Sequence, residues 1–278
     1  MTNREASIED WGILESFFKI IYRENHPLHN KDFWQWQYGD PAYGRSFISL
    51  NKKGEVVGHV GANFGGGLAW IINVYLNEEC RGQGILGKLY ELARNYYPLA
   101  ATAANEAGLG LYKNMRWIRY HDLVRYVKIN PIIEHKEFVH ICTPVNVKIQ
   151  SLIKKDTHYF NQPSIKGIIL SDGSRAVSQE EVGGLRIVDI NNLEQLEDHA
   201  WELGYKWIDY ISSWNDLKSK DLEKSGWALD YKSIIPWRLN PVEKDKFCNI
   251  TFLSEKPLNN NFVVHRSYSD HGRIGSLK

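Results

Sequence analysis

The sequence has little net charge and few cysteines. Its 34 Lys and Arg residues nearly balance 33 Asp and Glu residues, which leaves a formal charge of +1. No strong field therefore attracts the chain to nucleic acid or to a membrane surface. The three cysteines are far apart (Cys80, Cys142 and Cys248), which favours a reducing cytoplasm over a disulfide framework. No cysteine pair has the spacing of metal ligands and the ten histidines are scattered, so no metal is indicated.

Long apolar runs are also missing. No stretch is long enough to span a bilayer, and the start of the chain carries no signal peptide. We therefore predict a cytoplasmic protein with no membrane or nucleic-acid partner. The chain does have length and apolar content: its 278 residues, 43% of them hydrophobic, suffice for two domains with buried cores.

A glycine-rich stretch at residues 77–88 is the most informative part of the sequence. Residues 70–76 before it are apolar and β-branched, which predicts a buried strand. The apolar residues after it, from Ile85 to Ala93, recur three and four apart, which predicts an amphipathic helix. A turn between a strand and a helix presents free amide groups and the positive end of the helix dipole to an anion. Arg81 and Lys88 add positive charge.

Three phosphate-loop patterns compete for this stretch. The Walker A pattern fails, because Gly87-Lys88 is followed by Leu89. The dinucleotide pattern G-x-G-x-x-G is present at residues 82–87, but no acidic residue closes the following strand. The third pattern, Arg-x-x-Gly-x-Gly/Ala, resembles the pyrophosphate loop of the GCN5-related N-acetyltransferases (GNATs). Arg81 and Gly84 match it, whereas Leu86 departs from it. A glycine-rich turn without a ligand is the remaining alternative.

A second motif supports the GNAT resemblance. The family continues with Asn-x-x-Ala-x-x-Leu-Tyr-x-Lys-x-Gly-Phe, and residues 105–117 follow this pattern. Asn105, Leu111 and Tyr112 match it in register, Trp117 replaces Phe, and Arg116 departs from the usual Gly. Two linked motifs are more specific than either alone, and the resemblance covers residues 47–127.

The resemblance implies a fold and a co-substrate. The fold is α/β, with a mixed, mostly antiparallel sheet flanked by helices, and the co-substrate is acyl-CoA. In this family two strands part, pantetheine pairs with the exposed strand edge, and a strand amide, here near Leu76, stabilises the oxyanion. Tyr112 matches the general acid, which a phenol suits because it stays protonated at neutral pH. The implied cofactor residues are Tyr75, Leu76, Asn77, Arg81, Gly82, Gln83, Gly84, Ile85, Leu86, Gly87, Lys88, Asn105 and Tyr112.

No motif identifies the base that takes the proton of the acceptor amine. His59 and Asn73 lie on predicted strands from which they could face the site, and Asp270 near the C-terminus is another candidate. His59 has a suitable pKa, but it could equally be a core histidine with satisfied hydrogen bonds.

Periodicity predicts the elements along the chain. In the first half we expect helices at 7–22 and 31–38, strands at 45–51, 55–63 and 68–76, a helix from residue 85, a strand within 98–104, a helix, and a strand at 121–129. In the second half we expect strands at 138–147, 165–170, 175–177, 185–189, 207–211, 250–253 and 262–264, with helices after 147 and at 192–203 and 216–224.

A faint repeat suggests that the chain consists of two tandem GNAT-like halves. Arg116-Trp117 and the Asn-Pro pair at 130–131 recur as Gly226-Trp227 and the Asn-Pro pair at 240–241. The second copy has no glycine-rich loop. We therefore predict an acyl-CoA-binding domain at residues 1–131 and a degenerate GNAT-like domain at 132–278 that helps to form the acceptor site.

The acceptor is predicted from a further resemblance. The helix at 33–38 and the Ser-Asp-x-x-Arg segment at 269–273 look like bacterial two-part acyltransferases of surface-polysaccharide (O-antigen or capsule) clusters. These transfer acetyl or 3-hydroxyacyl groups, such as 3-hydroxybutanoyl, to the amine of a nucleotide-linked (dTDP) amino-deoxysugar. A peptide or small-amine acceptor, and a catalytically silent CoA-binding module, remain alternatives. The candidate substrate residues are aromatic residues that could stack on a sugar or a base, arginines that could bind a diphosphate, and one acidic residue. They are Trp34, Trp36, Tyr38, Arg238, Arg266, Asp270 and Arg273.

Overall fold

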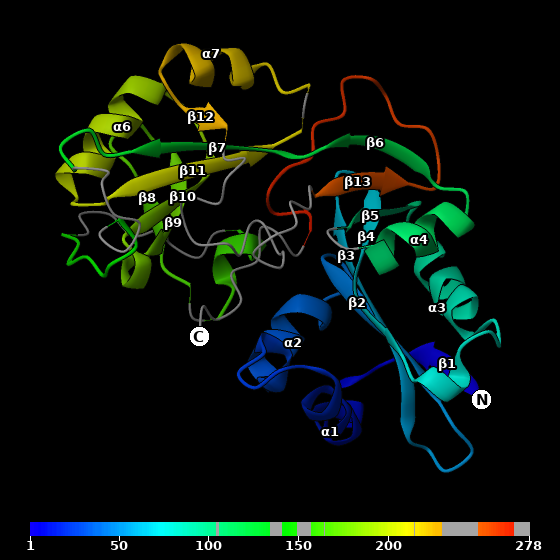
Figure 1. Ribbon diagram of the computed structural model, residues 1–278. Coiled ribbons are helices and arrows are strands. Elements are labelled where there is room, and N and C mark those ends of the chain that lie inside the picture. Colours follow the sequence, from blue (N-terminus) through cyan, green and yellow to red (C-terminus); the bar gives the residue numbers. More distant parts are fainter. Residues whose placement is uncertain are drawn as a thin grey trace.

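The computed structural model describes residues 1–103, 106–133, 141–148, 157–163, 165–213, 215–229 and 250–269. These residues form two β-sheets with helices packed against them (Figure 1). In chain order the elements are β1 Thr2–Glu5, η1 Ile8–Asp10, α1 Trp11–Ile21, η2 Pro27–His29, α2 Lys31–Tyr38, β2 Gly44–Leu50, β3 Val56–Gly65, β4 Leu68–Leu76, η3 Glu78–Cys80, α3 Ile85–Arg94, β5 Leu99–Ala103, α4 Glu106–Asn114, β6 Ile118–Asp122, β7 Val124–Ile129, η4 His158–Asn161, β8 Gly167–Ile169, β9 Arg175–Gln179, η5 Glu180–Val182, β10 Gly184–Asp189, α6 Leu193–Glu202, β11 Trp207–Ser212, α7 Lys218–Lys224, β12 Ala228–Leu229 and β13 Thr251–Ser254.

The first sheet lies between two pairs of helices. Its strand order is β1-β2-β3-β4-β5-β13-β6. α1 and α2 pack on one face, against Ile48 and Ile72, and α3 and α4 pack on the other, against Phe47 and Ile71 (Figure 1). The side chain of Asn30 caps α2 by accepting hydrogen bonds from the amides of its first turn. The bounds of α2 and β4 are those that the sequence predicted.

β4 and β5 run parallel and then part. They pair only from Ala69 opposite Leu99 to Ile71 opposite Ala101. β4 continues to Leu76 with β3 as its neighbour, so its later residues have no partner on the β5 side among the residues that the structure describes. A β-bulge interrupts the β3–β4 ladder at Asn73, whose φ of +51° lies in the left-handed region. This is the parting of strands that the GNAT resemblance implies.

The two halves exchange a strand. β6 ends at Asp122, and β7, which begins at Val124, leaves the first sheet to lie between β11 and β12 in the second. In return β13, near the C-terminus, enters the first sheet between β5 and β6. Figure 1 shows β6 and β7 as one ribbon that passes from the first sheet to the second. Each sheet is therefore completed by the other half of the chain.

The two sheets share one topology. The first half runs β2-β3-β4-α3-β5-α4-β6, and the second runs β8-β9-β10-α6-β11-α7-β12, with a parallel pair at β4–β5 and at β10–β11. In both halves the Trp amide bonds to a helix carbonyl five residues earlier: Trp117 to Tyr112 and Trp227 to Leu222. These matches support the duplication suggested by the faint sequence repeat.

Several predictions about elements were wrong. The strand predicted at 121–129 is two strands in different sheets, because the chain changes sheets at Leu123. Residues 141–147 and 262–264 are not strands, and β1 was missed. The predicted boundary at residue 131 does not separate the two sheets. β7 lies before this residue but belongs to the second sheet, and β13 lies after it but belongs to the first. The division into two domains at that residue stays a prediction.

Candidate functional site

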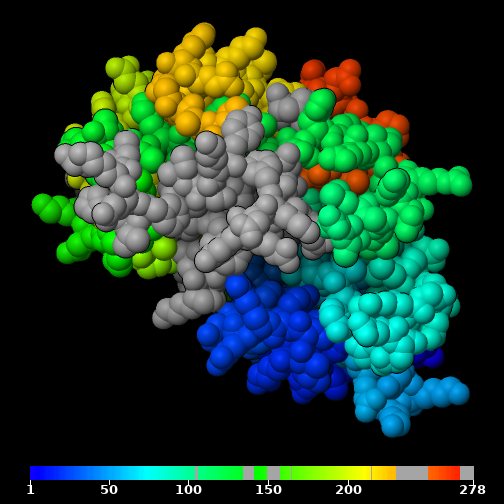
Figure 2. Space-filling model, viewed as in Figure 1, coloured from blue at the N-terminus to red at the C-terminus, as the bar shows by residue number. Residues whose placement is uncertain are grey.

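The glycine-rich loop connects the end of β4 to the start of α3. Gly82 and Gly84 have φ of +75° and +72°, a region that L side chains rarely adopt, and Gly84 is the N-cap of α3. No side chain caps this helix. Residues 81–84, 87 and 88 are exposed, and Figure 2 shows the cyan segment that contains this loop and α3 at the surface. The loop is therefore not packed away in the core.

The loop has the features of an anion site. In the part of the chain that the structure describes, the amides of residues 82–87 donate to no acceptor. A Cβ added at Gly82, Gly84 or Gly87 would meet no heavy atom within 4 Å, so the space above the backbone is open. Arg81 pairs with Glu78 at 3.3 Å, but both side chains are well exposed, and such a pair is weak. Arg81 and Lys88 can therefore turn toward an anion at this helix start.

The open edge of β4 lies next to this loop. The amide of Asn77 donates to Val57 on β3. Backbone groups of neighbouring strand residues point in opposite directions, so the N–H and C=O of Leu76 point away from β3, to the side that β5 leaves. A strand edge of this kind can pair with the amides of an extended ligand.

Tyr112 lies on α4 and is nearly buried, with 5% exposure. Its ring stacks on Trp117, with ring centroids 4.5 Å apart. Its hydroxyl lies beside that of Tyr90, whose pKa is raised, first by burial and then by Tyr112. The role of Tyr112 as a general acid stays a prediction.

His59 is a core residue. It is fully buried, and its two ring nitrogens bond to the Ser46 hydroxyl and the Asn73 carbonyl, both at 2.8 Å. Burial lowers the pKa of His59 to about 4. The hydrogen bond to the Asn73 carbonyl raises it, but by less than burial lowers it. Asn73 donates through its side chain to the Tyr38 hydroxyl at 2.8 Å. Both side chains are thus engaged on the α2 side of the sheet, and the roles of His59 and Asn73 in catalysis stay predictions.

The aromatic residues expected to stack on a sugar are engaged elsewhere. Trp34 and Tyr38 are 2% and 1% exposed and belong to the core between the first sheet, α1 and α2. Trp36 is half-buried, and its indole N–H donates to the His158 carbonyl at 2.8 Å. The His158 ring lies stacked between Trp36 and Tyr43, with centroids 5.0 and 3.9 Å away. The stacking prediction is therefore wrong for Trp34 and Tyr38, and Trp36 joins the halves instead.

Of the three arginines predicted to bind the acceptor, Arg266 lies in the described part of the chain. Arg266 is 4% exposed and donates to Asp209 at 2.8 Å and to the Ile187 carbonyl at 3.0 Å. Arg266 therefore lies inside the second half, and its role in binding a substrate stays a prediction. The predicted site residues outside the described ranges are Asn105, Arg238, Asp270 and Arg273.

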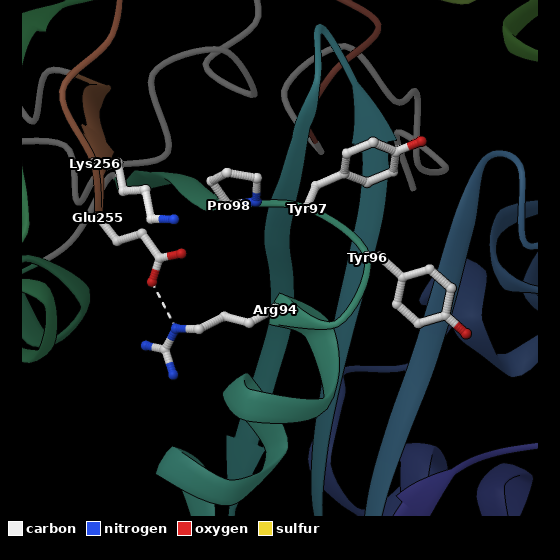
Figure 3. Close-up of a pocket in the computed structure, with 6 residues that line it drawn as sticks. All are labelled: Arg94, Tyr96, Tyr97, Pro98, Glu255 and Lys256. Carbon is white, nitrogen blue, oxygen red and sulfur yellow. Dashed lines mark hydrogen bonds and ion pairs between the residues drawn. The ribbon is translucent and has the colours of Figure 1, made fainter.

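A pocket of about 280 Å³ lies at the opposite end of α3 from the loop (Figure 3). There Glu255, which follows β13, accepts from Arg94 Nε at 2.6 Å and from the Leu99 amide at 2.8 Å. Tyr96 and Tyr97 point away from this ion pair in Figure 3. The contacts fasten the exchanged strand to α3 and β5, and the pocket is remote from the open edge of β4.

The described residues contain neither a candidate metal site nor a helix that could span a membrane. No group of three His, Cys, Asp or Glu side chains within the described ranges could hold a metal ion. Of the helices in the described part of the chain, none is both long and apolar enough to cross a membrane.

Comparison with known proteins identifies the fold. Residues 11–116 match the sequence model of the acetyltransferase (GNAT) family. A protein assigned as an acetyltransferase from Pyrococcus horikoshii is similar with a TM-score of 0.53 and 15% identity over 92% of this chain and 89% of that chain. No match was found among the curated proteins.

Two further solved structures are similar. A tandem GNAT protein from the clavulanic acid biosynthesis pathway covers 93% of this chain and 99% of its own, with 12% identity and a TM-score of 0.48. A GNAT-family acetyltransferase from Staphylococcus aureus Mu50 covers 43% of this chain and 85% of its own, with 16% identity and a TM-score of 0.36.

Residues 11–116 thus match the GNAT acetyltransferase model, and the chain has the fold of the acyl-CoA-dependent N-acyltransferases. The α/β fold class predicted from sequence is confirmed. The family's co-substrate, acyl-CoA, also fits the residues present, because free amides, open space above the glycines and an unpaired strand edge occur together. The sequence motif located the loop, whereas the extent of the open edge required the strand register.

Proposed function

We propose that this protein transfers an acyl group from acyl-CoA to the amine of an acceptor. The observation that carries the proposal is the row of amides at residues 82–87 beside the edge of β4, both of them unpaired within the described part of the chain. Those amides, with Arg81 and Lys88, would hold the pyrophosphate. The backbone of residues 75–77 would hold the pantetheine arm. Bound acyl-CoA supplies the thioester whose acyl group moves to nitrogen.

The residues of this chain orient and protonate the reacting groups. The Leu76 amide, which points to the open edge, is suited to stabilise negative charge on the acyl oxygen. We propose Tyr112 as the proton donor to the departing sulfur, because a phenol is protonated at neutral pH. The C–N bond forms as the C–S bond breaks, and the amine releases its proton to solvent. The proposal needs no step by His59, whose two ring nitrogens are bonded inside the core.

The acceptor that we propose is a nucleotide-linked amino-deoxysugar, with acetyl or a 3-hydroxyacyl group as the donor. The support is the sequence resemblance at residues 33–38 and 269–273. The burial of Trp34 and Tyr38 removes the stacking argument for a sugar. A peptide or a small amine therefore remains the alternative acceptor.

The CoA site is tested by calorimetric titration of CoA into the wild type and into the variant Arg81→Glu with Gly84→Glu. The variant reverses a charge and places a side chain at a left-handed glycine, so we expect binding at least ~100-fold weaker. Gly226→Glu is the matched control, because Gly226 is also left-handed (φ +80°) with open space above it. This control should bind CoA like the wild type. Equal affinity of the double variant and the wild type would rule out the proposed loop.

The acceptor is tested by release of free thiol from acetyl-CoA and 3-hydroxybutanoyl-CoA in the presence of candidate amines. The panel contains dTDP-linked amino sugars, peptides and polyamines. Thiol release with the amino sugars alone would support the proposed acceptor, and release with peptides or polyamines alone would replace it. CoA binding without thiol release for any amine would identify a silent CoA-binding module.

A further inference from the structure

A group of buried charges lies on the face of the second sheet that α6 and α7 do not cover. Arg186 on β10, Asp209 on β11 and Arg125 on β7 are 4%, 0% and 7% exposed, and Arg266 reaches them from the C-terminal segment. Asp209 accepts from Arg266 at 2.8 Å through one oxygen and from Arg125 at 3.1 Å through the other. Both carboxylate oxygens are therefore already engaged by arginines other than Arg186.

Arg186 is a buried cation whose guanidinium nitrogens Nε and Nη2 find no hydrogen-bond acceptor in the described part of the chain. This holds although Asp209 is the residue paired with it on β11. Burial lowers its pKa to about 9, with Asp209 raising it and the other arginines lowering it further, so the group remains charged at neutral pH. Burying a cation without a bonded anion is unfavourable, because the lost hydration is not replaced.

Further unsatisfied donors lie beside Arg186. Arg266 donates to the carbonyl of the adjacent Ile187, and its Nε has no acceptor among the described residues. Gln179 pairs with Gly184, two residues from Arg186 on β10, so it lies on the same face. The Gln179 amide is 1% exposed, and neither its oxygen nor its nitrogen is bonded within the described part of the chain.

The equivalent place in the first sheet is apolar. The residue after each repeated Trp gives a common starting point from which paired residues can be followed across each sheet. Across the first sheet these residues are Ile118, Ser254, Ala100 and Trp70, and across the second they are Ala228, Val127, Asp209 and Arg186. Arg186 thus stands where the first half has Trp70, which stacks on Phe252 with centroids 5.3 Å apart. An ordinary packed core is possible at this place in the fold, so the fold does not require the arginine.

We propose that Arg186, Arg266 and Gln179 bind an oxyanion, a carboxylate or a phosphate group, within the second half. Guanidinium groups match the geometry of both anions, and the Gln179 amide nitrogen supplies a neutral donor. The bound oxyanion satisfies donors that the described residues leave unpaired. The site lies outside the glycine-rich loop and is independent of CoA binding.

The test is thermal unfolding of the full chain in increasing sodium phosphate or sodium malonate, with sodium chloride at matched ionic strength. We expect a saturable rise in Tm with at least one of the two oxyanions. Stronger stabilisation by phosphate or by malonate identifies the group preferred. Arg186→Met should raise the half-saturating concentration about tenfold or more, because a charge-assisted bond is lost. Arg119→Met, which removes an arginine that is 62% exposed in its side chain, is the control and should respond like the wild type.

Two outcomes would overturn this site. One is a wild type that neither oxyanion stabilises beyond the chloride control, and the other is an Arg186→Met variant that responds like the wild type. If Arg186→Met does not fold, Arg186→Lys takes its place and should respond more weakly than the wild type; an equal response would also overturn the site. The Arg81→Glu, Gly84→Glu variant should keep its full response to malonate, which separates failure of this site from failure of the CoA loop.

Discussion

The two halves have the same topology but differ where strand passes to helix. In the first half, residues 77–84 form a long loop, and Gly84 leaves the start of α3 uncapped. In the second half only residues 190–192 connect β10 to α6, and the Asn192 side chain accepts from the Gln195 amide. The helix residue whose carbonyl accepts from the repeated Trp is Tyr112 in the first half and Leu222 in the second. The proposed binding of a diphosphate therefore depends on a few loop residues and not on the fold that the two halves share.

The halves also differ in what fills the equivalent sheet face. Trp70 and Phe252 stack in the first sheet, whereas Arg186, Asp209 and Arg125 lie in the second. The same place in the fold thus holds an apolar ring stack in the first half and buried charged groups in the second. Neither sheet is complete alone, because β7 and β13 are exchanged.

The largest effect should come from the exchanged strand. Phe252 is 1% exposed between Trp70 and Tyr120, so Phe252→Ala should lower the free energy of unfolding by about 3–5 kcal/mol. Because each sheet contains a strand from the other half, we expect one cooperative transition in urea that shifts as a whole. Leu217→Ala, at a position 86% exposed, is the control. Two separate transitions, with only one shifted, would show that the halves unfold independently.

The buried histidine of the first half should make the protein sensitive to acid. The pKa of His59 is lowered to about 4 by burial, against a reference value of about 6.5 in the unfolded chain. The unfolded state therefore binds a proton that the folded state excludes. The contribution of His59 to stability is fully present above pH ~6.5 and falls by about 3 kcal/mol as the pH drops toward 4. Urea unfolding across this range should give a flatter pH profile for His59→Gln, and an unchanged slope would contradict the assignment.

The difference between Tyr112 and Leu222 should appear in the rate of transfer. Tyr112→Phe removes the proposed proton donor while keeping the ring stacked on Trp117, so we expect kcat to fall about 100-fold with little change in CoA affinity. Leu222→Met in the second half should leave kcat unchanged. Steady-state thiol release measures both variants. A Tyr112→Phe enzyme with wild-type kcat would mean that the ring is only a core residue.

The smallest effect should come from the turn before each repeated Trp. Arg116 has a φ of +59°, whereas its counterpart Gly226 has +80°. Because a left-handed conformation strains a residue with a Cβ, Arg116→Gly should stabilise the protein by about 0.5–1 kcal/mol. Gly226→Ala should destabilise it by a similar amount. Denaturant midpoints compare the pair, and a loss of stability in Arg116→Gly would show that the arginine side chain contributes contacts that outweigh the strain.

Local signals in the sequence located the loop and most of the elements. Turn glycines and apolar periodicity depend on nearby residues, so β4, α2 and the start of α3 could be predicted without knowledge of the fold. The GNAT motifs named the donor loop for the same reason. The burial of Trp34, Tyr38 and His59 was not predicted, because residue type does not reveal which face of an element is buried. Arg186 was missed, although a charge within the apolar strand predicted at 185–189 was a signal.

By itself, the sequence determined that a glycine-rich turn joins a buried strand to an amphipathic helix, and that an Asn-Leu-Tyr motif follows it. These features depend on residues close together in the chain. Only the tertiary structure decided the exchange of β7 and β13, the open edge of β4 and the meeting of Arg186 with Asp209. Strand pairing joins residues far apart in sequence, and its register rather than local propensity sets which polar groups are paired and which remain available to a ligand.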